Sequence, residues 1–297
     1  MQMQIKNVVV AGAGVLGSQI AFQIARFGYQ VKIWNRHVDR AEQRLANIKA
    51  PFMKDMDKTA EDYEHAMDNI VEVSNDLPSM VSDADLVIES VSESLEIKKA
   101  FYEELNAVLP AHTIVASNSS TFMPSQLVKF TDYPERFLHM HFANHIWLHN
   151  VAEIVGTPET SAEVKEAVVS FTRSIDMVPI VLNKENPGYV MNALLIPLLN
   201  AAQALWARGV ADPQTIDKDW MLSNGSPMGP FMILDVVGLR TAYEIVENQY
   251  QKSKDPLAKK IADNLKAMID QGHTGVESGQ GFYHYPNPEF KDPDFWK

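Results

Sequence analysis

The first part of the chain alternates short apolar runs, rich in β-branched residues, with longer stretches that repeat apolar residues at helical spacing. This alternation predicts βαβ units, in which parallel strands form one sheet and helices cover its faces. The later runs follow at shorter intervals, which indicates additional strands at one edge of the sheet. The expected strands are Ile5–Val10, Gln30–Trp34, Leu86–Glu89, Thr113–Ser117, Phe137–His141, Val151–Val155 and Pro179–Leu182.

The pattern changes around Asn183–Pro187, a polar segment followed by Gly188. Helical patterns replace strand patterns beyond it. We therefore predict a Rossmann-type, mostly parallel α/β domain over residues 1–184 and an all-helical domain over residues 185–297. The expected helices of the second domain are Val190–Ala207, one beginning at Asp212-Pro213, Pro230–Gln251 and Asp255–Gln271.

The expected helix over Val190–Ala207 is apolar on nearly all sides, and Pro197 should kink it. A helix of this kind must be buried. The second domain is too small to enclose it fully. We therefore predict a homodimer in which the C-terminal helices form the interface and cover one of its faces.

Composition narrows the classes of partner. The chain has 297 residues, of which 46% are hydrophobic, so it can fill a globular core. Its formal net charge of −12 argues against binding to nucleic acid or to an anionic membrane surface. It has no Cys, no apolar stretch near the roughly 20 residues that span a bilayer, and no signal-peptide pattern at its start. We expect a cytoplasmic protein.

The segment Gly12-Ala13-Gly14-Val15-Leu16-Gly17 fits the pattern G-x-G-x-x-G. It follows an expected strand and opens an expected helix over Val15–Phe27, which is the context of a dinucleotide-binding loop. Gly12 permits the tight turn, Gly14 lets the pyrophosphate approach the backbone, and Gly17 allows the helix to pack on the strand. The helix N-terminus offers free N–H groups to the phosphates.

The end of the second expected strand bears on the choice between NAD(H) and NADP(H). An acidic residue usually binds the ribose there in NAD sites, but this chain has Asn35-Arg36. Asn35 can still bind a ribose hydroxyl, and Arg36 can pair with a 2′-phosphate. Arg36 can equally stack on adenine or face solvent, so the residues leave both cofactors open.

A second group of polar residues predicts the chemistry. His141 ends one expected strand, and Glu153 lies on the next, 12 residues further on. If these strands are neighbours, the imidazole can exchange a proton with a substrate oxygen while the carboxylate orients it. Ser120 and Asn192 could hold the same oxygen, and Asn144 could hold the nicotinamide. A buried His bonded to a Glu can also be structural.

Several histidines crowd the segment from Phe137 to Asn150, and His139 and His141 would share one face of a strand. Such spacing can bind zinc, but a catalytic zinc site needs three protein ligands. Hydride transfer from a nicotinamide needs no metal, so we expect none.

Segments from the glycine loop Gly12–Gly17 to Gly279–Tyr283 resemble, in their order and spacing, the L-3-hydroxyacyl-CoA dehydrogenase family, and within it the diketoreductase branch. The resemblance covers almost the whole chain. It implies His141 as general acid/base, Glu153 as its orienting partner, and Ser120 and Asn192 as ligands of the substrate oxygen. It also implies cofactor contacts from Glu93, Lys98 and Asn144, to which we add Asn118. The segments that carry the resemblance are Gly12–Gly17, Asp85–Glu89, Ser117–Ser120, His141-Phe142, Glu153, Pro187–Tyr189, Asn192, Ser226–Phe231 and Gly279–Tyr283.

The chain also departs from the acyl-CoA enzymes. It has Asn144-His145 where they usually have Asn-Pro, and Asn192-Ala193 where they have Asn-Arg. The segment that meets CoA in the family corresponds to Lys54–Glu64, which carries five acidic residues against two lysines. Repulsion of the CoA phosphates would favour a smaller keto ester or keto acid, unless this segment turns its acids to solvent.

Two other functions remain open. A dehydrogenase of the 6-phosphogluconate or 3-hydroxyisobutyrate type also begins with a Gly-rich loop and would explain Asn35-Arg36. It would need a catalytic Lys on the long helix, which offers Asn192 but no Lys. A structural protein, related to a lens crystallin, could bind the dinucleotide without turnover. The retained His141 and Glu153 argue against that role.

Overall fold

The computed structural model describes residues 4–297 and divides the chain into two compact units. The first ends at Val190, and the second runs from Met191 to Lys297.

The first unit contains one mixed sheet, whose eight strands within the described residues follow the order β3-β2-β1-β4-β5-β6-β7-β8. Every neighbouring pair is parallel except β6 and β7, which run antiparallel. The predicted α/β class with a mostly parallel sheet is confirmed, as are the additional strands at one edge. The strands are β1 Asn7–Ala11, β2 Gln30–Trp34, β3 Ile70–Ser74, β4 Leu86–Glu89, β5 Ile114–Ser117, β6 Phe137–Phe142, β7 Val151–Gly156 and β8 Val178–Val181.

The sequence pattern missed strand β3. It lies at the edge of the sheet and is only partly buried, so it lacks the continuous apolar run of a central strand. Its pairing with β2 stabilises it, and that partner is distant in the sequence.

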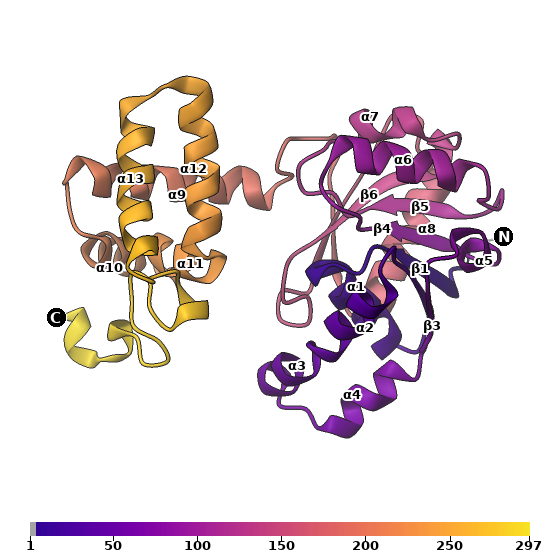
Figure 1. The fold of residues 1–297 in the computed structure, drawn as a ribbon, viewed down its shortest axis with the longest axis horizontal. Helices are drawn as coiled ribbons and strands as arrows, with labels where there is room; N and C mark the ends of the chain where they lie inside the picture. Colours follow the sequence, from indigo (N-terminus) through magenta and orange to yellow (C-terminus); the bar gives the residue numbers. More distant parts are fainter. Residues whose placement is uncertain (1–3) are drawn as a thin grey trace. The chain divides into compact units, whose positions relative to one another are not determined.

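Helices cover both faces of this sheet (Figure 1). One core joins α1 and α8 to side chains such as Val10 and Ile88, and the other joins α5 and α6 to side chains such as Val9 and Val87. Successive residues of a strand point to opposite faces, which explains how both cores share the same strands. The helices are α1 Val15–Arg26, α2 Val38–Ala46, α3 Lys49–Met56, α4 Ala60–Met67, α5 Leu77–Val81, α6 Leu95–Asn106, α7 Pro124–Leu127 and α8 Ala162–Ser174, with 3₁₀ turns at Val128–Phe130 and Pro134–Arg136.

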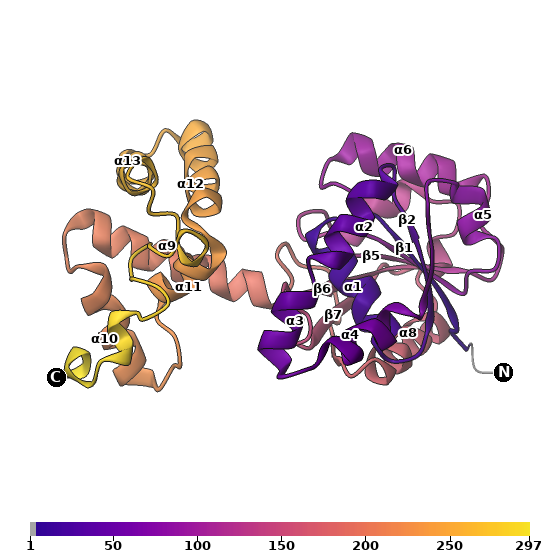
Figure 2. The ribbon, with the colours of Figure 1, turned by 60° about the horizontal axis from the view of Figure 1, so that its bottom comes forward.

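The second unit is helical, as predicted, and α12 and α13 lie side by side in it (Figures 1 and 2). The single helix expected over Pro230–Gln251 is wrong. Two helices occupy this segment, and Gly238 separates them with a φ of 90°, which an α-helix cannot contain. The helices are α9 Met191–Arg208, α10 Pro213–Asn224, α11 Pro230–Val237, α12 Leu239–Ser253 and α13 Pro256–Asp270, with 3₁₀ turns at Val276–Ser278, Glu289–Lys291 and Pro293–Trp296.

Two buried aspartates hold the second unit together. Asp217 accepts hydrogen bonds from the N–H groups of Phe231 and Met232 and from the Tyr283 hydroxyl. Asp235 accepts from the N–H groups of Phe282 and Tyr283. A Cβ at Gly229 or at Gly281 would lie within about 2 Å of these carboxylates. The motifs Ser226–Phe231 and Gly279–Tyr283 therefore have a structural role in this unit.

Apolar side chains remain exposed on the second unit. Leu194 on α9 is 71% exposed, and Val236 and Leu222 are each 62% exposed. Within residues 4–297, no helix combines the length and the hydropathy that crossing a bilayer requires.

Candidate active site

The glycine loop leaves β1 and enters α1. Gly12 has a φ of 102°, and a Cβ there would lie 2.5 Å from the carbonyl oxygen of Ser90. A Cβ on Gly17 would lie 1.9 Å from the carbonyl oxygen of Gly12. By contrast, nothing lies within 4 Å of a Cβ built on Gly14. The open side of the loop is therefore at Gly14, where α1 begins and its first N–H groups lack partners within the helix. This arrangement fits the phosphates of a dinucleotide.

The different surroundings of Gly14 and Gly17 predict different effects of an added methyl group. Gly17→Ala should lower the free energy of unfolding by about 1–3 kcal/mol, because the clash with Gly12 outweighs the higher helix propensity of alanine. Gly14→Ala should change it by less than about 1 kcal/mol, yet weaken NADH binding by roughly tenfold or more, because its methyl occupies the space that the pyrophosphate needs. Urea unfolding and a fluorescence titration with NADH measure the two effects. Unchanged NADH affinity in Gly14→Ala would contradict the phosphate site.

The end of β2 contributes to the loop. The side-chain oxygen of Asn35 accepts a hydrogen bond from the N–H of Ala13 at 3.0 Å, and its amide donates to the carbonyl of His37 at 2.7 Å. Asn35 thus fixes the glycine loop through its own side chain. Arg36 is exposed beside it.

Polar side chains line up across three neighbouring strands. Glu89, Ser117 and His139 are register partners on β4, β5 and β6, and they point to the face covered by α6. Glu89 is fully buried, and it accepts hydrogen bonds from Ser117 Oγ at 2.7 Å and from Tyr102 at 3.0 Å. Lys98, which is 1% exposed, places its ammonium 2.6 Å from Glu89. The predicted cofactor contact of Lys98 remains a prediction.

Glu93 joins this network to the loop after β5. Its carboxylate lies 3.1 Å from the Lys98 ammonium, and it accepts hydrogen bonds from Ser119 Oγ and from the N–H of Thr121. Burial raises the pKa of Glu93, but the Lys98 charge and these hydrogen bonds outweigh it and lower the pKa below its ordinary value. Glu93 is therefore anionic and holds the turn that contains Ser120.

His141, Glu153 and Ser120 come together on the same face of the sheet. His141 and Glu153 are direct partners in the antiparallel pairing of β6 with β7, which brings their side chains together. The Nδ1 atom of His141 lies 3.0 Å from Glu153 Oε2, and its Nε2 atom lies 3.0 Å from Ser120 Oγ. His141 and Glu153 are each 4% exposed, whereas Ser120 is exposed. The imidazole thus connects a buried carboxylate to a hydroxyl that faces accessible space.

Tyr189 belongs to Pro187–Tyr189, one of the segments that carry the family resemblance, but the sequence predicted no role for it. Its ring stacks on the His141 imidazole, with centroids 4.3 Å apart and planes inclined by 6°. The next N–H, that of Val190, donates to Glu153 Oε1 at 2.8 Å. The only signal in the sequence was the aromatic residue directly after the Pro-Gly step.

The predicted amide residues have different positions. Asn118 is buried, and its side-chain oxygen accepts from the N–H of Phe142 at 3.0 Å. Asn144 is exposed, and its oxygen accepts from the amide of Gln19 on α1 at 2.8 Å. Asn192 lies in the other unit, on the first turn of α9, and is half-buried. The roles of these three residues remain predictions.

The acidic segment Lys54–Glu64 is less free to repel anions than its sequence indicates. Asp55 accepts a hydrogen bond from Trp147 at 3.0 Å and pairs with His145 at 3.2 Å. Asp62 accepts a hydrogen bond from the N–H of Thr59, the N-cap residue of α4, and Glu64 pairs with Lys49.

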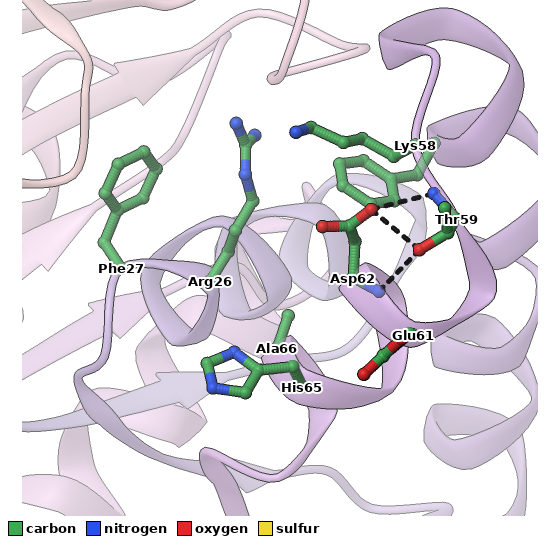
Figure 3. Close-up of a pocket in the computed structure, with 9 residues that line it drawn as sticks. Arg26, Phe27, Lys58, Thr59, Glu61, Asp62, His65 and Ala66 are labelled. Carbon is green, nitrogen blue, oxygen red and sulfur yellow. Dashed lines mark hydrogen bonds between the residues drawn. The ribbon is translucent and has the colours of Figure 1, made fainter.

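A hollow of about 440 Å³ lies beside this segment. Figure 3 shows Arg26 and Lys58 reaching into the same space, opposite Asp62. None of Ser120, His141 and Glu153 lines it.

The histidines of the predicted segment point to different partners, with His139 at Tyr189, His141 at Glu153 and His145 at Asp55. Within residues 4–297, no group of three or more His, Cys, Asp or Glu side chains is placed to hold a metal ion. His139 is fully buried, and burial, the Lys98 charge and His141 together lower its pKa to about 3. Its imidazole is therefore neutral.

Two models of one known family match the chain. The model of the NAD binding domain of 3-hydroxyacyl-CoA dehydrogenase matches residues 7–186, and the model of the C-terminal domain of the same enzymes matches residues 188–285. The chain belongs to the 3-hydroxyacyl-CoA dehydrogenase family. Membership of this family makes it a nicotinamide-dependent oxidoreductase of 3-hydroxy and 3-keto compounds, and the resemblance found in its sequence is confirmed.

Relatives in this family match along nearly the whole chain. The mitochondrial hydroxyacyl-coenzyme A dehydrogenase of Sus scrofa is 33% identical over 293 residues, which cover 95% of this chain and 91% of the relative. A probable 3-hydroxybutyryl-CoA dehydrogenase of Bacillus subtilis (strain 168) is 31% identical, with 95% and 98% covered.

Solved structures give the same result. A diketoreductase, described as catalysing reactions of dicarbonyl compounds, has a TM-score of 0.89 and 46% identity, with 95% of this chain and 99% of that chain covered. The (S)-3-hydroxybutyryl-CoA dehydrogenase of Ralstonia eutropha has a TM-score of 0.78 and 28% identity, with 96% and 100% covered.

Proposed function

We propose that the family's hydride transfer proceeds in this chain with His141 as general acid/base. The observation that carries this proposal is the position of the imidazole, with Glu153 on one nitrogen and Ser120 on the other. The buried carboxylate can stabilise the imidazolium and select its tautomer. The exposed hydroxyl marks where a substrate oxygen can approach.

The nicotinamide cofactor would be held by the loop from Gly12 to Gly17, with Glu93, Lys98, Asn118 and Asn144 as further contacts. When bound, it supplies or accepts the hydride at the substrate carbon. The side chains of the protein would transfer the proton at the substrate oxygen. His141 Nε2 delivers a proton to the oxygen when a ketone is reduced, and removes it when an alcohol is oxidised. Ser120 and, as we propose, Asn192 orient that oxygen.

We propose NAD(H) as the preferred cofactor, which the family's NAD binding domain supports. Asn35 occupies the position where NAD sites usually have an acidic residue, so no carboxylate at that position repels a 2′-phosphate. NADPH should therefore bind as well, but more weakly.

The exposed Arg36 would be the partner of the 2′-phosphate. Arg36→Ala should weaken NADPH binding by roughly fivefold or more and change NADH binding by less than about twofold, because only NADPH carries that phosphate. Titration with each reduced cofactor tests both statements. NADPH affinity that Arg36→Ala leaves unaltered would remove the assigned role of Arg36, and tighter NADPH than NADH binding would overturn the preference.

We propose a dicarbonyl compound or 3-keto ester of small size as the substrate, because the likeness to the diketoreductase exceeds that to the CoA enzymes. A CoA thioester is the second candidate, favoured by the cations of Arg26 and Lys58 at the hollow. NADH oxidation by the purified protein, followed with a 3,5-diketo ester and with acetoacetyl-CoA, separates the two. Higher kcat/KM with the ester is expected. Higher kcat/KM with the thioester would establish the second candidate, and turnover of neither would contradict the proposed function.

A homodimer through the C-terminal helices remains our proposal. Large apolar side chains that are exposed on the second unit, such as Leu194 and Val236, support it, because a second copy that covered them would remove apolar surface from water. Sedimentation as a monomer at micromolar concentration would contradict it.

A cytoplasmic location also remains a proposal, and relatives include proteins named as mitochondrial.

A further inference from the structure

We propose that Tyr189 is a positioning residue that aligns the whole proton-transfer group, an inference that rests on the proposed role of His141. Three contacts of the segment Tyr189-Val190 reach His141, Glu153 and the backbone next to Ser120. Each contact fixes one member of the group by a different kind of interaction.

The first contact is the aromatic stack. The Tyr189 ring lies nearly parallel to the His141 ring at a centroid distance of 4.3 Å. Hydrogen bonds at Nδ1 and Nε2 restrain the imidazole in its own plane, but they resist tilting out of that plane poorly. A ring packed against the imidazole face supplies the missing restraint, and stacked aromatic pairs are favourable at this distance.

The second contact is made by the Tyr189 hydroxyl. It donates its one proton to the carbonyl oxygen of Ser119, the residue directly before Ser120. The hydroxyl oxygen also lies 2.8 Å from His139 Nδ1. Because the hydroxyl proton is already used, His139 Nδ1 must donate to Tyr189, which fixes the His139 tautomer. The Tyr189 hydroxyl thus links strand β6 to the turn that presents Ser120 Oγ.

The third contact is the backbone beside Tyr189. Gly188 and Tyr189 have φ values of 77° and 54°, so the chain makes a tight turn in which a large aromatic residue adopts a left-handed conformation. Asn186 closes this turn through its carbonyl, which accepts from the N–H of Tyr189 at 2.9 Å. The turn directs the N–H of Val190 to Glu153 Oε1. Such a conformation costs free energy and persists only where surrounding contacts stabilise it.

Neither the Tyr189 phenol nor the His139 imidazole changes its charge in the ordinary pH range. Burial, with the nearby charges of Glu93, Glu153 and Glu89, raises the pKa of Tyr189 far above its usual value, so the phenol keeps its proton. The lowered pKa of His139, about 3, keeps its imidazole neutral. The hydrogen bond between the Tyr189 hydroxyl and His139 Nδ1 therefore keeps its direction across the ordinary pH range.

The test compares Tyr189→Leu, which removes ring and hydroxyl, with Tyr189→Phe, which restores the ring alone. Tyr189→Leu should lower kcat by roughly thirtyfold and Tyr189→Phe by roughly fivefold, while the Kd of NADH stays within about twofold of the parent. Tyr133→Phe is the matched control, because Tyr133 is equally buried and its hydroxyl has no hydrogen-bond partner within residues 4–297. It should leave kcat unchanged. The kcat values are calculated per NADH-binding site, so that unfolded protein does not lower them.

A double variant separates this inference from the proposed function. If Tyr189 acts mainly through His141, Tyr189→Leu should lower kcat much less in a His141→Ala background than in the parent, and only by the part that depends on Ser120. Parental kcat in Tyr189→Phe and Tyr189→Leu, with the expected loss of kcat in His141→Ala, overturns the inference alone. An equal loss from Tyr189→Leu in both backgrounds overturns it as well, because Tyr189 would then act elsewhere. Parental kcat in His141→Ala overturns the proposed function itself. If Tyr189→Leu does not fold, parental kcat in Tyr189→Phe still overturns the inference.

Discussion

Replacement of His141 by alanine is expected to lower kcat by about 10²–10⁴-fold while NADH binds with nearly the parental affinity. The imidazole is the group between Ser120 Oγ and the carboxylate of Glu153, at 3.0 Å from each, so its loss removes the proton donor and acceptor at the substrate oxygen. Cofactor binding depends on the glycine loop and should survive. Stopped-flow or steady-state rates and a fluorescence titration with NADH measure the two quantities.

Two controls accompany this variant. His141→Gln fills most of the space and can still form hydrogen bonds, but it cannot exchange a proton near neutral pH, so its loss of kcat should match that of alanine. His149→Ala removes an exposed histidine from the segment between β6 and β7 and should leave kcat unchanged. Activity within about threefold of the parent in His141→Gln would refute the acid/base role.

Replacement of Glu153 by glutamine should lower kcat by roughly 10²–10³-fold. Oε1 of Glu153 accepts the N–H of Val190, so the amide oxygen will take that position and its NH₂ group will face His141 Nδ1. Nδ1 must then accept a hydrogen bond, which places the single N–H of the neutral imidazole on Nε2. Nε2 can then no longer act as a base. The amide also provides no charge to stabilise the imidazolium.

The measurement for Glu153→Gln is kcat/KM in both directions, with the Kd of NADH and the midpoint of thermal unfolding beside it. The affinity for NADH should stay within about twofold. Glu166→Gln, which removes an exposed acid on α8, is the matched control and should behave as the parent. If Glu153→Gln loses thermal stability but keeps its kcat, the carboxylate is structural and the proposed pair is wrong.

The sequence by itself determined most strands of the first unit and its glycine loop. Apolar runs identified seven strands, because buried central strands need continuous apolar residues, and the edge strand β8 has such a run although it is mostly exposed. The loop from Gly12 to Gly17 could be interpreted locally, since its glycines serve a tight turn and the contact of Gly17 with Gly12 lies within the loop itself. The identity of the family followed from the order and spacing of motifs along almost the whole chain.

The tertiary structure alone decided which distant side chains meet. Edge strand β3 depends on its pairing with β2, and the break at Gly238 depends on a backbone angle that the apolar pattern between α11 and α12 does not reveal. The stack of Tyr189 on His141 joins residues 48 positions apart, and the burial of Lys98 against Glu89 crosses from a helix to a strand. Apolar periodicity reports which face of an element is buried, but not which partner covers it. Contacts between polar side chains therefore become visible only after the strands are placed in register.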